Sequence, residues 1–266
     1  MSQRPFLLIT NDDGILAPGL KHLWQTVHEE ADVAIVAPHY ERSGSGLSIT
    51  WTKPLHIQSV SWEASSSKPT PVWALNGTPA DCVKMALSVL LDRKPDLIIS
   101  GVNRGSNAGR TVLYSGTIGA VIEGALRNIP GIAFSFSDYE VPPVSSTKNI
   151  IVSLIHHFLK HPLPFGTFLN VNFPCNFAKE NKGFRIAKQG QGYWIESPEK
   201  RIHPEGVPYY WLGGKWKSFP EDPESDVSLL EQGYVAGVPI QVSQLTDESA
   251  YIDQKILLES TSISMI

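Results

Sequence analysis

Short apolar runs alternate with helix-like segments through residues 1–140, and this alternation constrains the fold more than any other feature of the chain. The runs Phe6–Thr10 and Val33–Ala37 have the length and composition of buried parallel strands, and polar or helical segments follow them. Strands that alternate with helices indicate a parallel sheet with helices on both faces. Right-handed crossover connections then favour the doubly wound, Rossmann-like arrangement. The sequence therefore predicts an α/β fold with a Rossmann-like, doubly wound, mostly parallel sheet.

Helix boundaries are marked by local signals. At Thr78 a side chain that can cap a helix is followed by Pro79, which suits the first turn, and by Asp81, which favours the positive end of the helix dipole. The predicted helices are Pro18 to about Glu30, Pro79 to about Leu91, Ile118 to about Asn128 and Lys148 to about Leu159, and the further predicted strands are Asp96–Ser100, Ile132–Phe136 and Phe168–Phe173.

The pattern changes beyond Pro174. Residues 189–226 are rich in Gly, Pro, Tyr and Trp and show little helical periodicity, so we expect a β-rich arm rather than an independent domain. We therefore predict a core of residues 1–175 and a C-terminal extension of residues 176–266.

Composition excludes several classes of protein. A net charge of -4 argues against a broad nucleic-acid-binding surface, so no nucleic-acid polymer is expected as a partner. The apolar run Phe6–Ile9 is too short for a signal-peptide core, and no stretch approaches the roughly 20 apolar residues that span a bilayer. We expect a cytoplasmic protein without a membrane partner, in which Cys82 and Cys175 are reduced thiols of the protein core.

Three unusual loops share one topological property. The loops Asn11–Gly14, Arg42–Gly46 and Gly101–Asn107 each follow the carboxyl end of a predicted strand. In a parallel sheet these ends lie along one edge, where ligands bind. We therefore expect loops that are far apart in sequence to meet there.

The side chains of these loops suit a metal ion. Asp12 and Asp13 are adjacent carboxylates, Ser43 brings a hydroxyl, and Asn103 and Asn107 bring amide oxygens. Such hard oxygen ligands favour Mg²⁺, Mn²⁺ or Ca²⁺ over zinc or copper, and a divalent cation removes the repulsion between neighbouring carboxylates. Taken alone, the two acids could be a turn with a helix-capping Asp, and it is the convergence of the loops that favours a metal site.

Glycines and hydroxyls in two of the segments suit an anion. The stretch Ser43–Gly46 offers unhindered backbone N–H groups, and Ser115–Thr117 precedes a helix, whose N-terminus favours phosphate. Each could instead be a flexible loop or a simple helix cap. The candidate phosphate-binding residues are Asn11, Gly44, Ser45, Gly46, Asn107, Ser115, Gly116 and Thr117.

Other catalytic motifs are missing from the sequence. No G-x-G-x-x-G follows the first strand, so a dinucleotide cofactor is not expected, and no Walker phosphate loop is present. The adjacent acids also differ from the D-x-D spacing of aspartyl-phosphate enzymes. His39 lies at the end of the second strand, where it could either handle a proton or be an ordinary surface residue.

Taken together, the motifs resemble the SurE family, the stationary-phase survival proteins that act as 5′/3′-nucleotidases. The resemblance covers residues 6 to about 175, and a weaker similarity continues at Glu231–Val242. The matching stretches are ITNDDG at Ile9–Gly14, APG at Ala17–Gly19, VAP and ERSGSG within Val36–Gly46, GTPADCV at Gly77–Val83, DLIISGVNRGSN at Asp96–Asn107, YSGT at Tyr114–Thr117, EG at Glu123–Gly124 and NVNFP at Asn170–Pro174.

The resemblance implies one divalent metal per subunit, Mg²⁺ or Mn²⁺, held by the four residues Asp12, Asp13, Ser43 and Asn103. It implies hydrolysis of nucleoside 5′ or 3′ monophosphates to nucleoside and phosphate, with Asp12 and Asp13 as the catalytic residues and short polyphosphate as a further candidate substrate. The chain departs from the family at His39, where many relatives are expected to carry Asp or a similar polar residue.

The resemblance also implies that the C-terminal extension assembles a homodimer or homotetramer. The aromatic residues of the arm could stack on a nucleobase or be buried against a neighbouring subunit, and we favour the interface because large exposed aromatics usually indicate association. Two other functions remain open from the residues alone, a nucleotide-binding stress module with little turnover and a phosphatase for another small phosphoester.

Overall fold

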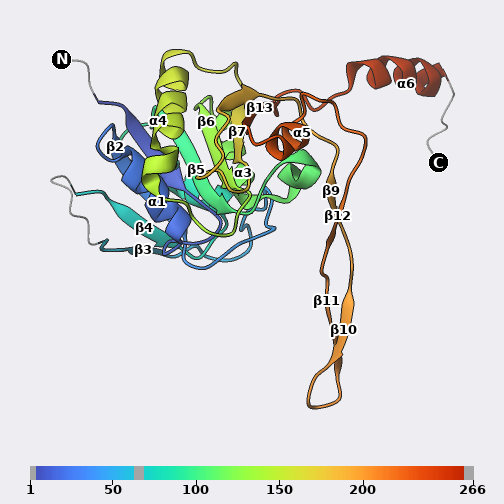
Figure 1. The fold of residues 1–266 in the computed structure, drawn as a ribbon, viewed down its shortest axis with the longest axis horizontal. Helices are drawn as coiled ribbons and strands as arrows, with labels where there is room; N and C mark the ends of the chain where they lie inside the picture. Colours follow the sequence, from blue (N-terminus) through green and yellow to red (C-terminus); the bar gives the residue numbers. More distant parts are fainter. Residues whose placement is uncertain (1–3, 63–68, 261–266) are drawn as a thin grey trace.

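A central sheet of mixed direction organises the molecule (Figure 1). The computed structural model describes residues 4–62 and 69–260, and in that range the sheet has the strand order β3-β4-β2-β1-β5-β6-β7-β13-β8. The strands from β4 to β7 run parallel, whereas β3 and β13 are antiparallel to their neighbours β4 and β7. The predicted mostly parallel α/β fold is confirmed. The strand bounds are β1 (Phe6–Thr10), β2 (Asp32–Pro38), β3 (Ile57–Ser59), β4 (Val72–Leu75), β5 (Leu97–Arg104), β6 (Gly131–Phe136), β7 (Thr167–Phe173), β8 (Phe184–Ile186) and β13 (Val235–Gln241).

Helices cover both faces of the sheet. The helices α1 (Pro18–Val27) and α4 (Val144–Lys160) pack on one face, and α2 (Pro79–Met85) and α3 (Gly116–Ala125) pack on the other. Successive strand residues face opposite sides, so Leu7 belongs to one apolar core and Leu8 to the other. This two-faced burial explains why the strand sequences are continuously apolar rather than alternating.

The helix signals in the sequence located the start of α2 correctly, but other helix bounds differ from the prediction. Thr78 caps α2, and the side chain of Asp81 accepts a hydrogen bond from the Thr78 backbone N–H in return. The expected single helix up to Leu91 instead changes after Met85 into the π-helix η1 (Ala86–Leu90), where Leu91 N donates to Ala86 O at 3.0 Å. The helix α4 begins earlier than predicted, directly after Pro143.

Strand β5 is longer than predicted. The stretch from Gly101 to Arg104 was expected to be loop, but it continues the strand, with a register shift against β6 between Ser100 and Asn103. Gly101 has a φ of 125°, and a Cβ there would lie 2.3 Å from Phe134 O. Only glycine fits this bulge, so here it marks an irregular strand rather than a strand end.

The C-terminal part supplies an arm, two sheet strands and two helices. The arm is a long hairpin that extends away from the sheet (Figure 1). After it the chain forms α5 (Asp226–Glu231), returns to the sheet as β13, and ends in α6 (Glu248–Ser260), which projects from the body. The arm consists of two antiparallel pairs formed by β9 (Tyr193–Ile195) with β12 (Lys215–Lys217) and by β10 (Glu199–Ile202) with β11 (Pro208–Trp211).

The two cysteines lie in different environments. Cys82 is buried as expected, but Cys175 is exposed because it follows the end of β7, so the expectation that both are core thiols was wrong for Cys175. Within residues 4–62 and 69–260, no helix combines the length and the apolar character that a membrane crossing requires.

Candidate functional site

The loops after β1, β2 and β5 are joined at the carboxyl edge of the sheet. The backbone N–H of Arg42 donates to Asp12 O at 2.7 Å, which ties the second loop to the first. The backbone N–H of Arg104 donates to Asp13 Oδ2 at 3.2 Å, which ties the end of β5 to the same loop. Loops that are distant in sequence therefore share one site, as the parallel topology predicts.

Asp12 is a buried charged group of this edge, with 3% of its surface exposed. Its Oδ1 accepts a hydrogen bond from the Thr117 hydroxyl, and the backbone N–H groups of Gly116 and Thr117 also face the carboxylate. Burial raises the pKa of Asp12 above its usual range, although these hydrogen bonds oppose the shift. The carboxylate is thus held rigidly at the N-terminus of α3.

Glycines let α3 approach the two loops closely. A Cβ at Gly116 would lie 2.6 Å from Ser45 Oγ and 2.9 Å from Asp12 Cβ. A Cβ at Gly119 would lie 2.3 Å from Gly46 O. The helix itself begins where Ser115 Oγ accepts from Ile118 N at 3.3 Å. These contacts bring together four of the predicted phosphate-binding residues and Asp12.

Asp13 differs from its neighbour in being half-buried. Its pKa is raised to about 6, first by burial and then by the negative charge of Asp12, while the Arg104 backbone N–H acts in the opposite direction. Two adjacent carboxylates with raised pKa values are unfavourable without a compensating positive charge. This is the electrostatic setting that a divalent cation stabilises.

Ser43 and Asn103 lie on the same edge but make contacts of their own. Ser43 is exposed, and its hydroxyl donates to Glu41 Oε1 at 2.6 Å. Asn103 Nδ2 donates to Gly105 O at 2.7 Å, which leaves its Oδ1 as the side-chain atom able to serve as a ligand. Among the described residues, no hydrogen bond joins either side chain to Asp12 or Asp13.

Several buried polar atoms of this edge lack hydrogen-bond partners among the described residues. They include Asn11 Oδ1 and Ser45 Oγ, together with Thr10 Oγ1 and Ser100 Oγ, which are paired in register on β1 and β5. Asn11 is oriented by its own Nδ2, which donates to Gly14 O at 2.9 Å. Buried polar atoms normally have partners, so their concentration here indicates a place for a polar ligand.

The loop amides predicted to bind phosphate are partly engaged within the protein. Ser45 N donates to Arg42 O at 3.2 Å, and Gly46 N donates to Tyr114 O at 3.0 Å. Gly44 stands at the open tip of the loop, with a φ of 72°, and a Cβ added there would meet no atom within 4 Å. Ser45 Oγ and the Gly44 backbone are therefore the groups best placed to meet an anion.

Asn107 belongs to a buried polar cluster behind the site. Its Nδ2 donates to Ser135 Oγ at 2.9 Å, its backbone N–H donates to Asn172 Oδ1 at 2.7 Å, and its carbonyl accepts from Asn170 Nδ2 at 2.9 Å. Ser106 Oγ also donates to Asn172 Oδ1, at 3.2 Å. This cluster fixes the loop after β5, and the phosphate contact predicted for Asn107 stays a prediction.

Sequence reasoning did not assign a role to Asn170 and Asn172. Both lie on the buried strand β7, two positions apart, and therefore on one face. Polar residues at alternate positions of an otherwise apolar strand were the available signal, because a buried amide must find partners. Arg104 and Glu41, whose side chains pair at 3.9 Å, were also missed, and their exposed positions gave no such signal.

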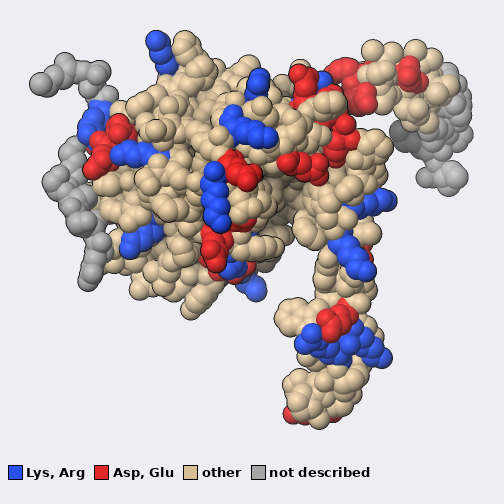
Figure 2. Space-filling view, viewed as in Figure 1, with Lys and Arg blue, Asp and Glu red and all other residues tan. Residues whose placement is uncertain are grey.

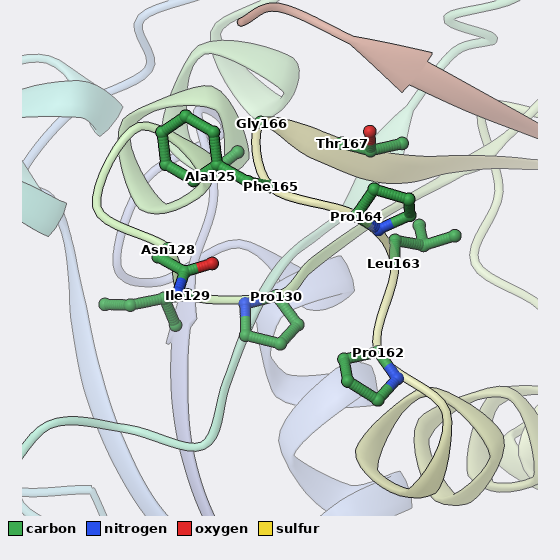
Figure 3. Close-up of a pocket in the computed structure, with 10 residues that line it drawn as sticks. All are labelled: Ala125, Asn128, Ile129, Pro130, Pro162, Leu163, Pro164, Phe165, Gly166 and Thr167. Atoms are coloured by element: carbon green, nitrogen blue, oxygen red, sulfur yellow. The ribbon is translucent and has the colours of Figure 1, made fainter.

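A separate pocket lies at the opposite edge of the sheet (Figure 3). It has a volume of about 240 Å³ and is formed by the segments that enter β6 and β7, so it lies at the amino ends of these strands. None of its lining side chains is ionisable, and prolines and apolar residues such as Leu163 and Phe165 dominate it. This pocket therefore offers no side chain for acid–base or metal chemistry.

Comparison with known proteins gives a consistent result. Residues 7–196 match the family described as Survival protein SurE. The 5'-nucleotidase SurE of Protochlamydia amoebophila is 47% identical over 261 residues, which cover 98% of this chain and 99% of the relative. The 5'-nucleotidase SurE of Moorella thermoacetica is 40% identical over 89% of this chain and 90% of the relative. The crystal structure of the Aquifex aeolicus SurE protein is similar with a TM-score of 0.79 and 33% identity, covering 96% of this chain and 100% of that chain.

Proposed function

The chain belongs to the SurE family, and from this membership we propose that it is a 5′-nucleotidase that hydrolyses nucleoside monophosphates to nucleoside and phosphate. The observation that carries the proposal is the buried Asp12 carboxylate, fixed by Thr117 at the N-terminus of α3 and surrounded by polar atoms without partners in the described part of the chain. A helix N-terminus beside hydroxyls and glycines suits a phosphate group.

The residues present fit a divalent metal. Asp12, Asp13, Ser43 and Asn103 offer only oxygen ligands, and the raised pKa values of both carboxylates support the proposal that a positive charge is favourable there. We propose that these four residues hold Mg²⁺ or Mn²⁺. When bound, such a metal polarises a phosphoryl oxygen and lowers the pKa of a bound water.

The side chains of the chain then have separate tasks. Thr117 keeps Asp12 in one orientation, and the α3 N-terminus favours the negative charge of the phosphoryl group. Ser45 Oγ and the Gly44 backbone donate to non-bridging oxygens, whose charge increases in the transition state. Asp13, whose Oδ2 accepts from Arg104, accepts the proton of the attacking water at Oδ1. Asn11, Gly46, Asn107, Ser115 and Gly116 complete the proposed phosphate-binding set.

We also propose that residues 176–266 serve assembly into a homodimer or homotetramer around the catalytic core of residues 1–175. Large apolar side chains are exposed on the arm, where Trp211 has 61% of its surface accessible, and on α6, where Ile256 has 66%. Figure 2 shows Lys and Arg side chains gathered on the same arm, where Lys200 and Arg201 belong to β10. Large exposed apolar groups rimmed by charges are typical of protein interfaces.

Phosphate release from a panel of nucleoside monophosphates tests the proposed activity. Release should require Mg²⁺ or Mn²⁺ and stop on addition of EDTA. The relative rates of release rank the bases and the 5′ and 3′ isomers as substrates. Short polyphosphate and a simple aryl phosphate serve as comparison substrates. Release from the aryl phosphate but from no nucleotide would contradict the nucleotidase assignment and favour another phosphoester.

A further inference from the structure

Asp226, the first residue of α5, is a fully buried carboxylate outside the proposed metal and phosphate set. Its Oδ1 accepts from the backbone N–H groups of Gly190 and Val227, both at 2.8 Å. Its Oδ2 accepts from the backbone N–H of Gly109 and from Gln189 Nε2, both at 3.0 Å. One side chain thus joins three segments that are far apart in sequence.

Capping of α5 does not account for this arrangement. Ser225 is the N-cap of α5 and accepts from Ser228 N, and of the four donors to Asp226 only Val227 belongs to the helix. The other donors belong to the base of the arm and to the loop after β5. Burial raises the pKa of Asp226 although three backbone N–H groups oppose the shift, so the group is kept at this position against a desolvation cost.

Backbone contacts close the same joint between the arm and the loop. Arg110 N donates to Gly192 O at 2.8 Å, and a Cβ at Gly109 would lie 2.3 Å from that oxygen. On the arm side, Glu221 accepts from Gly192 N at 2.9 Å, and Trp216 packs so closely that a Cβ at Gly192 would lie 2.3 Å from its ring. The base of the arm is therefore fixed against residue 109 without room for adjustment.

The loop side of the joint leads directly to the proposed site. Gly109 begins the 3₁₀ helix η2 (Gly109–Tyr114), which is followed directly by Ser115, the N-cap of α3. Two residues later, Thr117 donates to Asp12. The position of η2 consequently sets where the N-terminus of α3 meets the Asp12 carboxylate.

We infer that Asp226 is a positioning residue, which clamps η2 to the base of the arm and so keeps Thr117 and Asp12 in their working geometry. The catalytic consequence rests on the proposed nucleotidase function. The clamp requires a carboxylate because all four partners are N–H donors, and an Asn at this position would turn an NH₂ group toward two of them. Small displacements of positioned groups lower the rate of the chemical step more than they affect substrate binding.

The test compares Asp226→Asn with Asp222→Asn, which removes an exposed carboxylate near the same helix that pairs with Lys188 at 2.8 Å. Initial rates with nucleoside monophosphates and Mn²⁺ should show kcat lowered about tenfold or more in Asp226→Asn, with KM changed less than about threefold. Asp222→Asn should match the parent chain. A kcat for Asp226→Asn equal to that of the control overturns the inference.

Hydrogen exchange measured by mass spectrometry supplies a readout that does not depend on activity. Peptides that cover residues 105–118 should exchange about tenfold faster in Asp226→Asn than in the control, while peptides from β1 and β6 remain unchanged. Uniformly faster exchange would show a global loss of stability and overturn a local clamp. If the parent chain hydrolyses no nucleotide, the proposed function fails, but the exchange pattern still decides whether the clamp exists.

Gln189→Ala provides a second variant in case Asp226→Asn does not fold. Gln189 Nε2 donates to both Asp226 and the carbonyl of Gly109, and its side chain is only half-buried. We expect a smaller kcat loss of about threefold and faster exchange confined to residues 105–118. A folded Gln189→Ala chain with unchanged kcat and unchanged exchange in this segment also contradicts the clamp.

Discussion

The carboxyl edge of the sheet and the hairpin arm are constructed in contrasting ways. At the sheet edge, Asp12 is buried, hydrogen-bonded and packed against glycines that leave no spare space. On the arm, β10 and β11 pair only with each other among the described residues, and all of their residues are exposed. An isolated two-stranded hairpin is marginally stable in water. The difference indicates that the site is organised within one chain, whereas the exposed arm supports the proposed assembly and meets the site through the joint at Asp226.

The largest effect should follow from adding one methyl group at the sheet edge. In Gly116→Ala the new Cβ would lie 2.6 Å from Ser45 Oγ and 2.9 Å from Asp12 Cβ, so α3 must move away from the carboxylate. We expect kcat/KM for nucleoside monophosphates to fall about a hundredfold, measured by phosphate release. Gly214→Ala on the arm is the matched control, because its Cβ would be at an ordinary 3.4 Å from Trp194 and should leave the rate unchanged. Equal rates in both variants would remove the contrast between the regions.

A buried histidine under the sheet edge should make stability depend on pH. His22 is buried against Thr147, with 2.8 Å between Nε2 and Oγ1, and desolvation lowers its pKa to about 4. Since the unfolded pKa is about 6.5, the contribution of His22 is full above pH 6.5 and is lost as the pH falls toward 4. From pH 7.5 to 5 we expect this contribution to decline by about 2 kcal/mol.

Urea unfolding of the parent chain and of His22→Gln measures this contribution. The difference between their free energies of unfolding isolates His22, because the carboxylates with raised pKa values titrate in both chains and their contributions cancel. In each chain those contributions have the opposite sign to that of His22. The difference should shrink as the pH is lowered from 7.5 to 5. A difference that stays constant over this interval contradicts the assigned pKa.

Metal binding should depend on the ionisation of Asp13. Because burial and the Asp12 charge raise the pKa of Asp13 to about 6 in the metal-free chain, the carboxylate is protonated below that pH and cannot act as a ligand. We expect the affinity for Mn²⁺, measured by calorimetry, to rise about tenfold per pH unit below 6 and to level off above it, because the metal and the proton compete for the carboxylate. Asp13→Asn should bind Mn²⁺ far more weakly and should lack this rise. An affinity that is constant from pH 5 to 8 in the parent chain would refute the role of Asp13.

The smallest effect on chemistry is expected from the arm. Replacing Tyr210 and Trp211 by Ser removes exposed aromatic surface without touching the sheet edge. Light scattering should show a shift from a dimer or tetramer to a smaller species, while the rate per chain stays within about twofold. A parent chain that already has the mass of one protomer would contradict the assembly proposal.

Local sequence signals were enough to predict most of the fold. The apolar runs located the central strands, and Thr78 with Asp81 located the start of α2, because burial and capping are decided within a few residues. The extension of β5 through Gly101 was missed, since the same glycine can end a strand or allow a bulge, and only the neighbouring Phe134 backbone decides between them.

The meeting of the loops at the candidate site was also predictable from the sequence, but some long-range contacts were not. Parallel topology predicted that the loops after β1, β2 and β5 would meet, and backbone hydrogen bonds from Arg42 and Arg104 join them. The partnership of Asp226 with Gly109 was not predictable, because it joins residues 117 positions apart and resembles an ordinary acidic residue in the first turn of a helix. The assignment of Asp12, Asp13, Ser43 and Asn103 to a metal remains a proposal.

Calorimetric titration with Mn²⁺, combined with phosphate release on the same preparations, tests whether Asp12 holds the metal that hydrolysis requires. The chains to compare are the parent, Asp12→Asn, and Asp92→Asn, which removes an exposed carboxylate. We expect Asp12→Asn to lose metal binding and nucleotide hydrolysis together, by about a thousandfold in rate, while Asp92→Asn keeps both. Full metal-dependent turnover in Asp12→Asn would show that the chemistry lies elsewhere in the molecule.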